Sequence, residues 1–579
     1  MTPAPFPSPG RLLDGSAPAA PRPPRALELY LDGNEGPPPE DDGATVLAAA
    51  GSELLRRYPD ASALERELAA YLGVPADELL VTAGADEALD RIARAWLGPG
   101  RELLLPSPSF EMLARYARLS GADVREVAWE PGAPWPLDEI LSALSPRTGV
   151  VAVVSPNNPT GGEVAPEFVR ELSARAPASV LLVDQAYGEF TSNSLLATAR
   201  ALPNALFVGT FSKARGLAGL RIGYVVGPPA ALALLRRAGG PYSLAGPSLA
   251  LARHFLACGD AALARTVARV RVEREALAAL ATELGARTFP SAANFVLWRA
   301  RDGAWLADAL AGQGLAVRTF PARPELVRDV RITCPAAHAP FERLVRALRV
   351  AAAPEALLLD MDGVLVDAND SYDATILAVA EELGVAATRA DVQRVRRAGG
   401  ANDDVELLAR LCAGHASRAE LEQRFERRYW GPDGDGLCRE ERPLVARATL
   451  EALAARLPLA IVTGRPRRDA LRFLEAHELL SLFRTLVCSE DAPRKPDPAP
   501  VRRALAELGC ARAWMVGDTV DDVRAARAAG IPAIGVVARA DEPRRARGAL
   551  ERAGAEHVLD DLFALDALLA DRAAIGDAR

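Results

Sequence analysis

Short apolar runs alternate with longer Ala-, Leu- and Arg-rich stretches through the first 350 residues. Each run is nearly continuous in Val, Leu and Ala and ends at a polar turn, which is typical of a parallel strand buried on both faces. The stretches between the runs are long enough to form helices. The pattern predicts an α/β fold, with strands in ELLVTAG (78–84), RTGVVAVVS (147–155), ASVLLVDQ (178–185) and NALFVGTFS (204–212).

A second series of apolar runs begins straight after an Ala/Pro stretch at 351–356, which we interpret as a short linker. Between 368 and about 450 the strand pattern disappears, so that segment is predicted to be an all-helical insertion. The chain therefore predicts two α/β parts, at 26–350 and 357–575. The second series of runs consists of LLLD (357–360), PLAIVTG (458–464), TLVCSE (485–490), RAWMVGD (512–518) and PAIGVV (532–537).

Composition and charge narrow the kinds of partner. Half of the 579 residues are hydrophobic, a quarter are charged, and the formal net charge is -8. This modest acidic excess argues against a nucleic-acid or membrane partner, and no apolar stretch is long enough to span a bilayer. The Pro-rich residues 1–25 lack the features of a secretory signal. We expect them to form a disordered tail and the protein to be cytoplasmic.

Polar side chains follow three strands of the first half, where the carboxyl ends of parallel strands open on one crevice. One lysine, Lys213, and one carboxylate, Asp184, would meet there, which suits pyridoxal phosphate. A lysine can hold the cofactor aldehyde, and a carboxylate can keep the pyridine nitrogen protonated. The cofactor phosphate needs backbone N–H groups, hydroxyls and an arginine, and the candidates are Gly84, Ala85, Asp86, Thr210, Ser212 and Arg221.

Residues 26–350 resemble a fold-type I aminotransferase with large and small domains, most closely the histidinol-phosphate aminotransferases. The resemblance lies in LDGNEGP (31–37), RRYPD (56–60), TAGADEALD (82–90), PSPSF (106–110), SPNNPTGG (155–162), VDQAYGEF (183–190), TFSKARGLAGLRIGY (210–224), SAANFVL (291–297) and VRIT (330–333).

The resemblance implies roles for individual residues. Lys213 would bond the cofactor and Asp184 would pair with the pyridine nitrogen. Asn158 and Tyr187 would contact the ring oxygen, and Phe110 would stack on the ring. The resemblance also implies a homodimer in which Tyr58 reaches a cofactor phosphate across the interface. The residues expected to bind substrate, with glutamate as an amino donor, are Arg331, Arg318 and Asn34.

Some of these interpretations have alternatives. Lys213 taken alone could be a surface lysine at a strand end, and Arg331 could serve a structural ion pair. Two positions depart from the family pattern, because Phe110 stands where tyrosine is usual and Gly36 stands where asparagine is commoner. Phe110 keeps the stacking surface and loses the hydroxyl. These departures leave the central chemistry intact and weaken the assignment of substrate.

The second half begins with paired acids at the end of an apolar run, in DMDGVLVD (360–367). Two adjacent carboxylates repel unless a cation or a proton lies between them, and Mg²⁺ accepts carboxylates, water and phosphate oxygens together. Asp360 could then attack phosphorus while Asp362 acts as general acid and base. A calcium loop is excluded because Val364 and Leu365 stand where that loop needs an oxygen ligand.

Later motifs supply the remaining parts of a phosphoryl-transfer site. VTGRP contains Thr463 and RKPDP contains Lys495, a hydroxyl and a cation for the phosphoryl oxygens. GDTVDD (517–522) adds a second acidic cluster. Together these motifs resemble a haloacid-dehalogenase-type phosphatase with a Rossmann-like core and a helical cap at 368–450. The resemblance implies Asp360 as nucleophile and a Mg²⁺ site drawn from Asp360, Asp362, Asp518 and Asp522.

The helical insertion contains one polar, Gly-rich stretch, AGGANDDVELL (398–408). Asn402 and Asp403 are candidates for facing a substrate cavity beneath the cap. The alternative is that one of them caps the N-terminus of a helix.

The two resemblances together lead to a hypothesis of consecutive reactions. The first half would make histidinol phosphate, and the second would remove its phosphate. One alternative keeps both chemistries with another amino acid or phosphorylated amine and an unrelated phosphate ester. A second alternative makes the phosphatase-like half a non-catalytic scaffold. The complete set of acids, threonine and lysine argues against a scaffold, because repelling carboxylates have no structural use.

Overall fold

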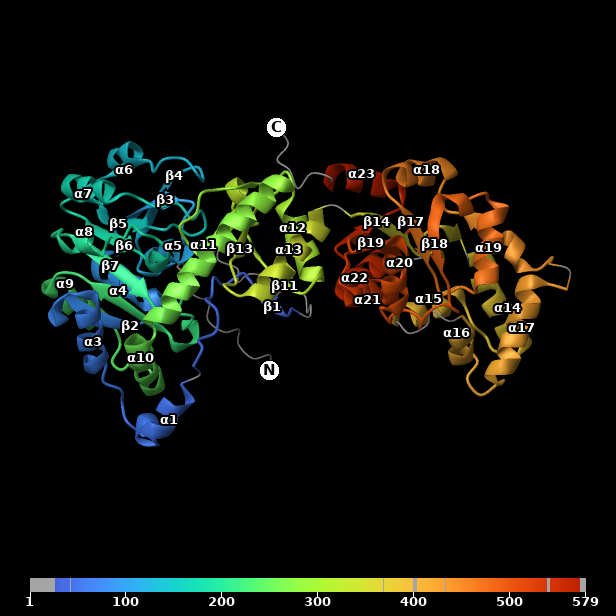
Figure 1. The fold of residues 1–579 in the computed structure, drawn as a ribbon, viewed down its shortest axis with the longest axis horizontal. Helices are drawn as coiled ribbons and strands as arrows, with labels where there is room; N and C mark the ends of the chain where they lie inside the picture. Colours follow the sequence, from blue (N-terminus) through green and yellow to red (C-terminus); the bar gives the residue numbers. More distant parts are fainter. Residues whose placement is uncertain are drawn as a thin grey trace, which may run out of the picture.

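The computed structural model describes residues 27–41, 43–352, 354–367, 369–398, 404–432, 434–538 and 542–572. The Pro-rich stretch at 1–25 and the cap candidates Asn402 and Asp403 lie outside these residues. Figure 1 shows two α/β parts, with blue to green elements on the left and orange to red elements on the right. The predicted fold class is confirmed. Within the described part, no helix is both long and apolar enough to cross a membrane.

The N-terminal part is built on a seven-stranded sheet whose predicted central strands are present. Its strand order is β2 (Leu79–Ala83), β8 (Ile222–Val226), β7 (Ala205–Thr210), β6 (Val180–Asp184), β5 (Thr148–Val154), β3 (Glu102–Ser107) and β4 (Asp123–Ala128). The helices of this part are α1 (Ala44–Ala50), α2 (Glu53–Arg56), α3 (Ser62–Leu72), α4 (Gly84–Trp96), α5 (Glu111–Leu119), α6 (Leu137–Ala143), α7 (Pro166–Arg175), α8 (Leu196–Arg200), α9 (Pro229–Ala238) and α10 (Gly246–Cys258).

Strand β8 is not among the predicted strands, and it interrupts the parallel pattern expected of this sheet. It runs antiparallel to both β7 and β2. The connection from β7 to β8 contains the Lys213 turn and only a short 3₁₀ segment, Ala218–Leu220. A parallel return needs a crossover of a dozen or more residues, so this short connection reverses the strand direction.

The long helix α11 (Asp260–Glu283) leads to a smaller unit with a four-stranded antiparallel sheet. Its strand order is β12 (Arg318–Thr319), β13 (Asp329–Thr333), β10 (Phe295–Arg299) and β9 (Arg287–Thr288). Beside it, β1 (Leu29–Tyr30) pairs in parallel with β11 (Leu315–Ala316), which ties the start of the described chain to this unit. Its two further helices are α12 (Gly303–Gly312) and α13 (His338–Ala352).

The C-terminal part has a six-stranded parallel sheet, as predicted for a Rossmann-like core. Its order is β18 (Phe483–Val487), β17 (Leu459–Val462), β14 (Ala356–Leu359), β19 (Ala513–Gly517), β20 (Ala533–Val536) and β21 (His557–Leu559). Its helices are α18 (Arg447–Arg456), α19 (Arg467–Ala476), α20 (Ala499–Leu508), α21 (Val520–Ala529), α22 (Pro543–Ala553) and α23 (Phe563–Arg572).

Along the sequence, a helical insertion lies between β14 and the other strands of this sheet. A two-stranded ribbon of β15 (Val366–Asp367) and β16 (Arg442–Pro443) carries the chain out of the core and back. Between these strands lie the one-turn segments η6 (Asn369–Asp373) and η7 (Leu437–Glu440), and the helices α14 (Ala374–Glu382), α15 (Arg389–Ala398), α16 (Asp404–Leu411) and α17 (Arg418–Trp430).

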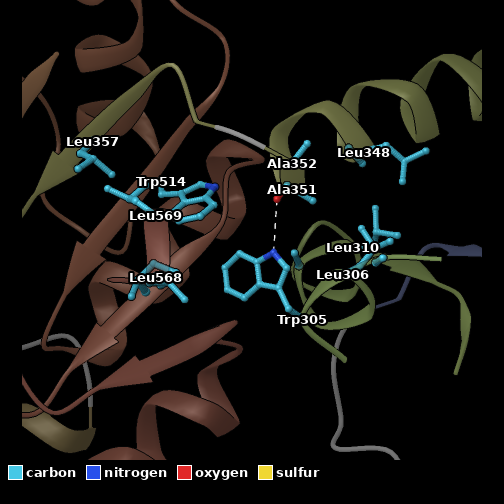
Figure 2. Close-up of a cluster of buried hydrophobic side chains, with 14 of the residues drawn as sticks. Trp305, Leu306, Leu310, Leu348, Ala351, Ala352, Leu357, Trp514, Leu568 and Leu569 are labelled. Carbon is cyan, nitrogen blue, oxygen red and sulfur yellow. Dashed lines mark hydrogen bonds between the residues drawn. The ribbon is translucent and has the colours of Figure 1, made fainter. Parts of the chain in front are cut away.

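The two parts pack directly against each other through a pair of tryptophans (Figure 2). The rings of Trp305 on α12 and Trp514 on β19 lie 5.2 Å apart. Their indole N–H groups donate to the carbonyl oxygens of Ala351 and Val350, at 3.4 and 3.2 Å. Ala351 and Ala352 are helical and buried, so the connection is shorter than the linker expected at 351–356. Alanine favours helix, and burial against the second part extends α13 into that stretch.

This packing predicts that a change in one part will loosen the other. Trp305→Ala removes a buried indole from the N-terminal side, at a cost of about 3–5 kcal/mol in the free energy of unfolding. Hydrogen exchange of the β14 and β19 amides should therefore accelerate although neither strand is altered. Leu234→Ala, at an exposed apolar residue on α9, which Figure 1 shows at the far side of the N-terminal part, is the control. Unchanged exchange in β14 and β19 would contradict the expectation.

Candidate active sites

A cavity of about 1760 Å³ opens in the N-terminal part between the seven-stranded sheet and the smaller unit. Nearly all of the predicted cofactor and substrate residues line it, although they come from segments up to 300 residues apart. The lining includes Asn34, Ala85, Asp86, Phe110, Asn158, Asp184, Tyr187, Thr210, Ser212, Lys213, Arg221, Arg318 and Arg331.

Asp184 is the buried acid at the end of β6. Its side chain is largely removed from water, and burial raises the pKa of its carboxyl group to about 6. The Ala186 N–H, which donates to Oδ1 at 2.9 Å, opposes this rise. A carboxylate held in such a place gains from a cationic partner, and the protonated nitrogen of a pyridine ring would be one.

Lys213 lies in the turn after β7, and its amino group faces the cavity. Nζ donates to the Gly33 carbonyl oxygen at 2.9 Å and lies 5.8 Å from the centre of the Tyr187 ring. The Tyr187 hydroxyl in turn accepts a hydrogen bond from Asn34 Nδ2 at 2.8 Å. Lys213 is therefore held at the cavity and is not a freely solvated surface lysine.

The N-terminus of α4 lies at the cavity, where Ala85 and Asp86 line it. Gly84 has a φ of +77°, and a Cβ there would lie 2.5 Å from Arg221 Nη2. Arg221 also donates to Asp86 Oδ2 at 3.1 Å. The hydroxyls of Thr210 and Ser212 lie 2.9 Å apart at the end of β7. Backbone N–H groups at a helix start, hydroxyls and an arginine are the donors that a phosphate needs.

Arg331 occupies the opposite wall, on β13. Its Nη1 donates to Asn158 Oδ1 at 2.5 Å, and its guanidinium group stacks on Phe295. Its Nε is buried and has no hydrogen-bond partner among the described residues. No carboxylate pairs with it there, so the structural ion pair considered above is not formed. Arg318, the second candidate, pairs with Glu111 at 2.8 Å.

Tyr58, a predicted cofactor residue, does not line the cavity of the single chain. Its side chain is 79% exposed and stacks on Tyr242, with ring centres 4.4 Å apart. The exposed face of Tyr58 is therefore directed to the surface of the single chain and away from its cavity.

The buried charge of Asp184 predicts a pH-dependent stability in protein prepared without cofactor. The pKa of Asp184 is raised in the folded state. Its carboxyl group therefore does not lower the free energy of unfolding below about pH 3.8, and it lowers that free energy by the full amount above about pH 6. The full amount is about 3 kcal/mol. Asp184→Asn should thus be more stable than wild type by about 3 kcal/mol at pH 8 and by only about 1 kcal/mol at pH 4.5, as measured by urea unfolding. A difference that stays constant with pH would contradict this.

The C-terminal part gathers three carboxylates at the ends of β14 and β19. Oxygens of Asp360, Asp518 and Asp522 all lie within 4.8 Å of one another. Gly363 has a φ of +73°, and a Cβ there would lie 2.0 Å from Asp518 Oδ2, so only glycine lets these two loops meet. Three clustered carboxylates, one of them exposed enough to accept further ligands, fit the oxygen ligation of Mg²⁺.

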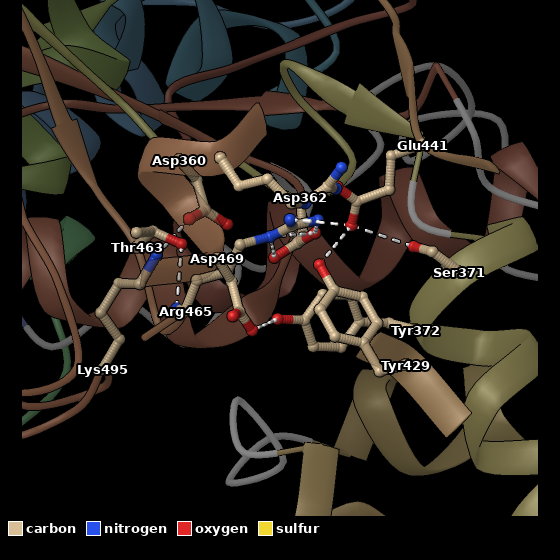
Figure 3. A network of polar contacts seen from close by, with 11 residues as sticks. Asp360, Asp362, Ser371, Tyr372, Tyr429, Glu441, Thr463, Arg465, Asp469 and Lys495 are labelled. Atoms are coloured by element: carbon tan, nitrogen blue, oxygen red, sulfur yellow. Dashed lines mark hydrogen bonds and ion pairs between the residues drawn. The ribbon is translucent and has the colours of Figure 1, made fainter. Parts of the chain in front are cut away.

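Lys495 lies beside Asp360 (Figure 3) and also contacts Asp522 of this acidic cluster. Its Nζ contacts Asp360 Oδ1 at 2.8 Å and Asp522 Oδ1 at 2.5 Å, and donates to the Val462 carbonyl oxygen at 3.0 Å. Burial raises the pKa of Asp360, and Asp522 raises it further against the effect of Lys495. Thr463 is buried at the end of the neighbouring strand β17. The predicted nucleophile, hydroxyl and lysine are therefore brought together.

Asp362 differs from its prediction as a metal ligand. It is absent from the carboxylate group found in the described residues. Its two oxygens accept hydrogen bonds from Arg465 Nε at 3.0 and 2.9 Å. Sequence reasoning missed Arg465, and also Glu441, which Arg465 contacts on its other side. The available signal was an arginine two residues after Thr463 at a buried strand end.

Lysine usage is a second signal that the sequence offered. Among the 68 basic residues of the chain, 66 are arginines and two are lysines, Lys213 and Lys495. Arginine is always charged and cannot form an imine, whereas lysine is a compact amine on a flexible stem. Both lysines lie at the two sites described here, which indicates that each position needs an amine.

Comparison with known proteins divides the chain at the same place. Residues 30–348 match the model of aminotransferase class I and II, and residues 354–530 match that of haloacid dehalogenase-like hydrolase. Histidinol-phosphate aminotransferase 1 of Trichormus variabilis is 32% identical over 57% of this chain and 93% of its own length. An imidazoleglycerol-phosphate dehydratase of Phytophthora nicotianae is 42% identical over 32% of this chain and 43% of its own length.

A solved structure shares the fold of the N-terminal part. Histidinol-phosphate aminotransferase from Sinorhizobium meliloti, in complex with pyridoxal-5'-phosphate, superimposes with a TM-score of 0.52 at 24% identity. The match covers 56% of this chain and 91% of that one.

Proposed function

Because the chain belongs to the class I and II aminotransferases and continues into a haloacid dehalogenase-like hydrolase domain, we propose that it makes histidinol phosphate by amino transfer and then hydrolyses the phosphate ester. The observation that carries the proposal is that one chain holds both sets of residues, each gathered around one of its two lysines.

The first site would hold pyridoxal phosphate, which supplies an electron sink for the amino acid carbons when bound. Lys213 would bond the aldehyde and move the proton, and Asp184 would keep the pyridine nitrogen charged. Asn158 and Tyr187 would fix the ring oxygen, with Phe110 against the ring face. The phosphate would lie at the start of α4. Arg331 would bind the acidic group of the substrate, supported by its unpaired buried Nε.

The second site would hold Mg²⁺ on Asp360, Asp518 and Asp522. Asp360 would attack phosphorus while Thr463 and Lys495 hold the phosphoryl oxygens, and Asp362 would transfer the protons. The helical insertion would act as a cap that excludes water during the reaction. The buried contacts between Lys495 and two carboxylates support this arrangement, because a cation beside the proposed nucleophile would stabilise the charge that develops on the phosphoryl group.

We also propose a homodimer formed through the aminotransferase part. Tyr58 is the supporting residue, since a large aromatic side chain is exposed beside Tyr242 in the single chain. In a dimer it would complete the phosphate site of the second copy. Size-exclusion chromatography with light scattering tests the assembly, and a monomer at micromolar concentration would contradict it.

The substrate proposal rests on the named relatives, and a coupled assay tests it. The protein is incubated with imidazole-acetol phosphate, glutamate, pyridoxal phosphate and Mg²⁺. Histidinol with an equal amount of inorganic phosphate is the expected result. Histidinol phosphate that accumulates unhydrolysed would restrict the proposal to amino transfer, and the absence of amino transfer would overturn the choice of substrate.

A further inference from the structure

Arg465 is a buried arginine that contacts the Asp362 carboxylate and the base of the helical insertion at once (Figure 3). Its side chain is 1% exposed. Nε donates to both oxygens of Asp362, and Nη1 donates to Glu441 Oε1 at 2.9 Å. The guanidinium group therefore divides its donors between Asp362, in the loop after β14, and Glu441.

Glu441 and Tyr372 mark the two places where the chain passes between the hydrolase core and the insertion. Tyr372 lies in η6, shortly after β15, and Glu441 directly precedes β16. The guanidinium carbon of Arg465 lies 4.6 Å from the centre of the Tyr372 ring. Arg465, a residue of the core, thus contacts the chain both where it enters the insertion and where it leaves it.

Contacts from the insertion and the core fix the two partners of Arg465. Glu441 is buried and accepts hydrogen bonds from Tyr429 on α17 at 2.9 Å and from Ser371 at 3.1 Å. The Tyr372 hydroxyl donates to Asp469 on α19 at 2.7 Å. A displaced insertion would remove Glu441 and Tyr372 from Arg465, and a buried guanidinium that loses its partners is costly. The position of Arg465 therefore depends on the helical insertion staying packed against the hydrolase core.

The bonding pattern favours one of the two proton transfers expected of Asp362. Arginine carries only N–H donors, and both oxygens of Asp362 accept from it. A carboxylate held as an acceptor can take a proton from water, whereas it has none to give to a leaving group. The geometry suits the second half of a phosphatase reaction, in which water is activated.

On the basis of the proposed phosphatase function, we propose that Arg465 is a positioning residue that orients Asp362 to activate water while the insertion is seated. In that step the water oxygen bonds to phosphorus and the bond between phosphorus and Asp360 breaks. The water proton passes to Asp362, and the Asp360 carboxylate is regenerated. Arg465 exchanges no proton and acts only through Asp362.

The test separates the two half-reactions with p-nitrophenyl phosphate, whose leaving group departs without an acid. Arg465→Lys keeps the charge beside buried Glu441 and loses the forked geometry. We expect kcat to fall about 10²-fold and KM to fall with it, while kcat/KM, which reports the first step, stays within about threefold. Rapid mixing should show a burst of about one p-nitrophenolate per site, with phosphate retained on the protein.

Arg472→Lys is the matched control. Arg472, on α19, donates to Glu441 and makes no contact with Asp362 among the described residues, so Arg472→Lys should produce neither the burst nor the fall in kcat. Glu441→Gln should show the same selective fall in kcat as Arg465→Lys, to a smaller extent, because Arg465 then loses an anionic partner. Thermal unfolding of each variant verifies that it remains folded.

Several results would overturn the inference. Equal falls in kcat and kcat/KM for Arg465→Lys would mean general damage to the site. The same burst in Arg472→Lys would assign the effect to Glu441 alone. If the wild-type protein with Mg²⁺ released no more p-nitrophenolate than the Asp360→Asn variant, the phosphatase proposal itself would be overturned, and this inference with it.

Discussion

Asp360→Asn should abolish phosphate release from a phosphate ester and leave amino transfer unchanged. The amide has nearly the same shape as the carboxyl group, but it lacks the anion that attacks phosphorus. It also removes one of the three carboxylates gathered for a cation. Loss of a covalent nucleophile costs up to about 10⁶-fold in kcat, and we expect at least 10⁴-fold here. Phosphate release and glutamate-dependent amino transfer are measured on the same preparation.

Unfolding cannot explain such a loss. Burial and Asp522 raise the pKa of Asp360, which means that the folded state without a bound cation penalises its charge. A neutral side chain relieves that penalty, so Asp360→Asn should unfold at the same temperature as wild type or higher. Asp497→Asn, an exposed acid in the Lys495 loop, is the control and should keep full activity. Phosphatase activity that survives in Asp360→Asn would remove Asp360 from the role of nucleophile.

The strand ends of both sites could be predicted because they depend on local pattern. A continuous apolar run identifies a buried strand, and the polar residue that ends it lies at the carboxyl edge of the sheet. Asp184, Lys213, Asp360 and Thr463 were found in this way, and the structure places each at its cavity or cluster.

The contacts between distant segments could not be predicted in this way. Asp362 and Glu441 are 103 and 24 residues from Arg465, and no periodicity links such positions. The strands of the smaller unit were missed because several contain two residues, too few to show alternation. The direction of β8 depended on the length of a connection and not on its own apolar pattern.

The packing of the two parts could not be predicted for the same reason. Trp305 and Trp514 are large apolar residues that sequence reasoning had no cause to pair, since each belongs to a different fold pattern. Their contact makes the hydrolase a fixed neighbour of α12, and α12 also lines the aminotransferase cavity through Ala307, Asp308 and Ala311. The position of the hydrolase part relative to α12 is therefore set by packing and not by a flexible linker.

Lys213→Ala should abolish amino transfer and leave hydrolysis of added histidinol phosphate intact. The change removes the amine that would bond the cofactor and move the proton, and no other lysine can replace it. Lys495, the only other lysine in the chain, is buried in the hydrolase between two carboxylates. The expected loss is at least about 10⁴-fold in kcat, by analogy with other covalent catalytic groups.

The scarcity of lysine makes the test unusually selective. Borohydride reduction of the protein with pyridoxal phosphate should attach the cofactor to a single peptide, the one containing Lys213, and to no peptide in Lys213→Ala. Lys213→Arg is the matched variant, because it keeps the charge near Asp184 yet cannot form an imine; it should be as inactive as Lys213→Ala. A labelled peptide containing Lys495, or amino transfer that persists in both variants, would contradict the assignment of Lys213.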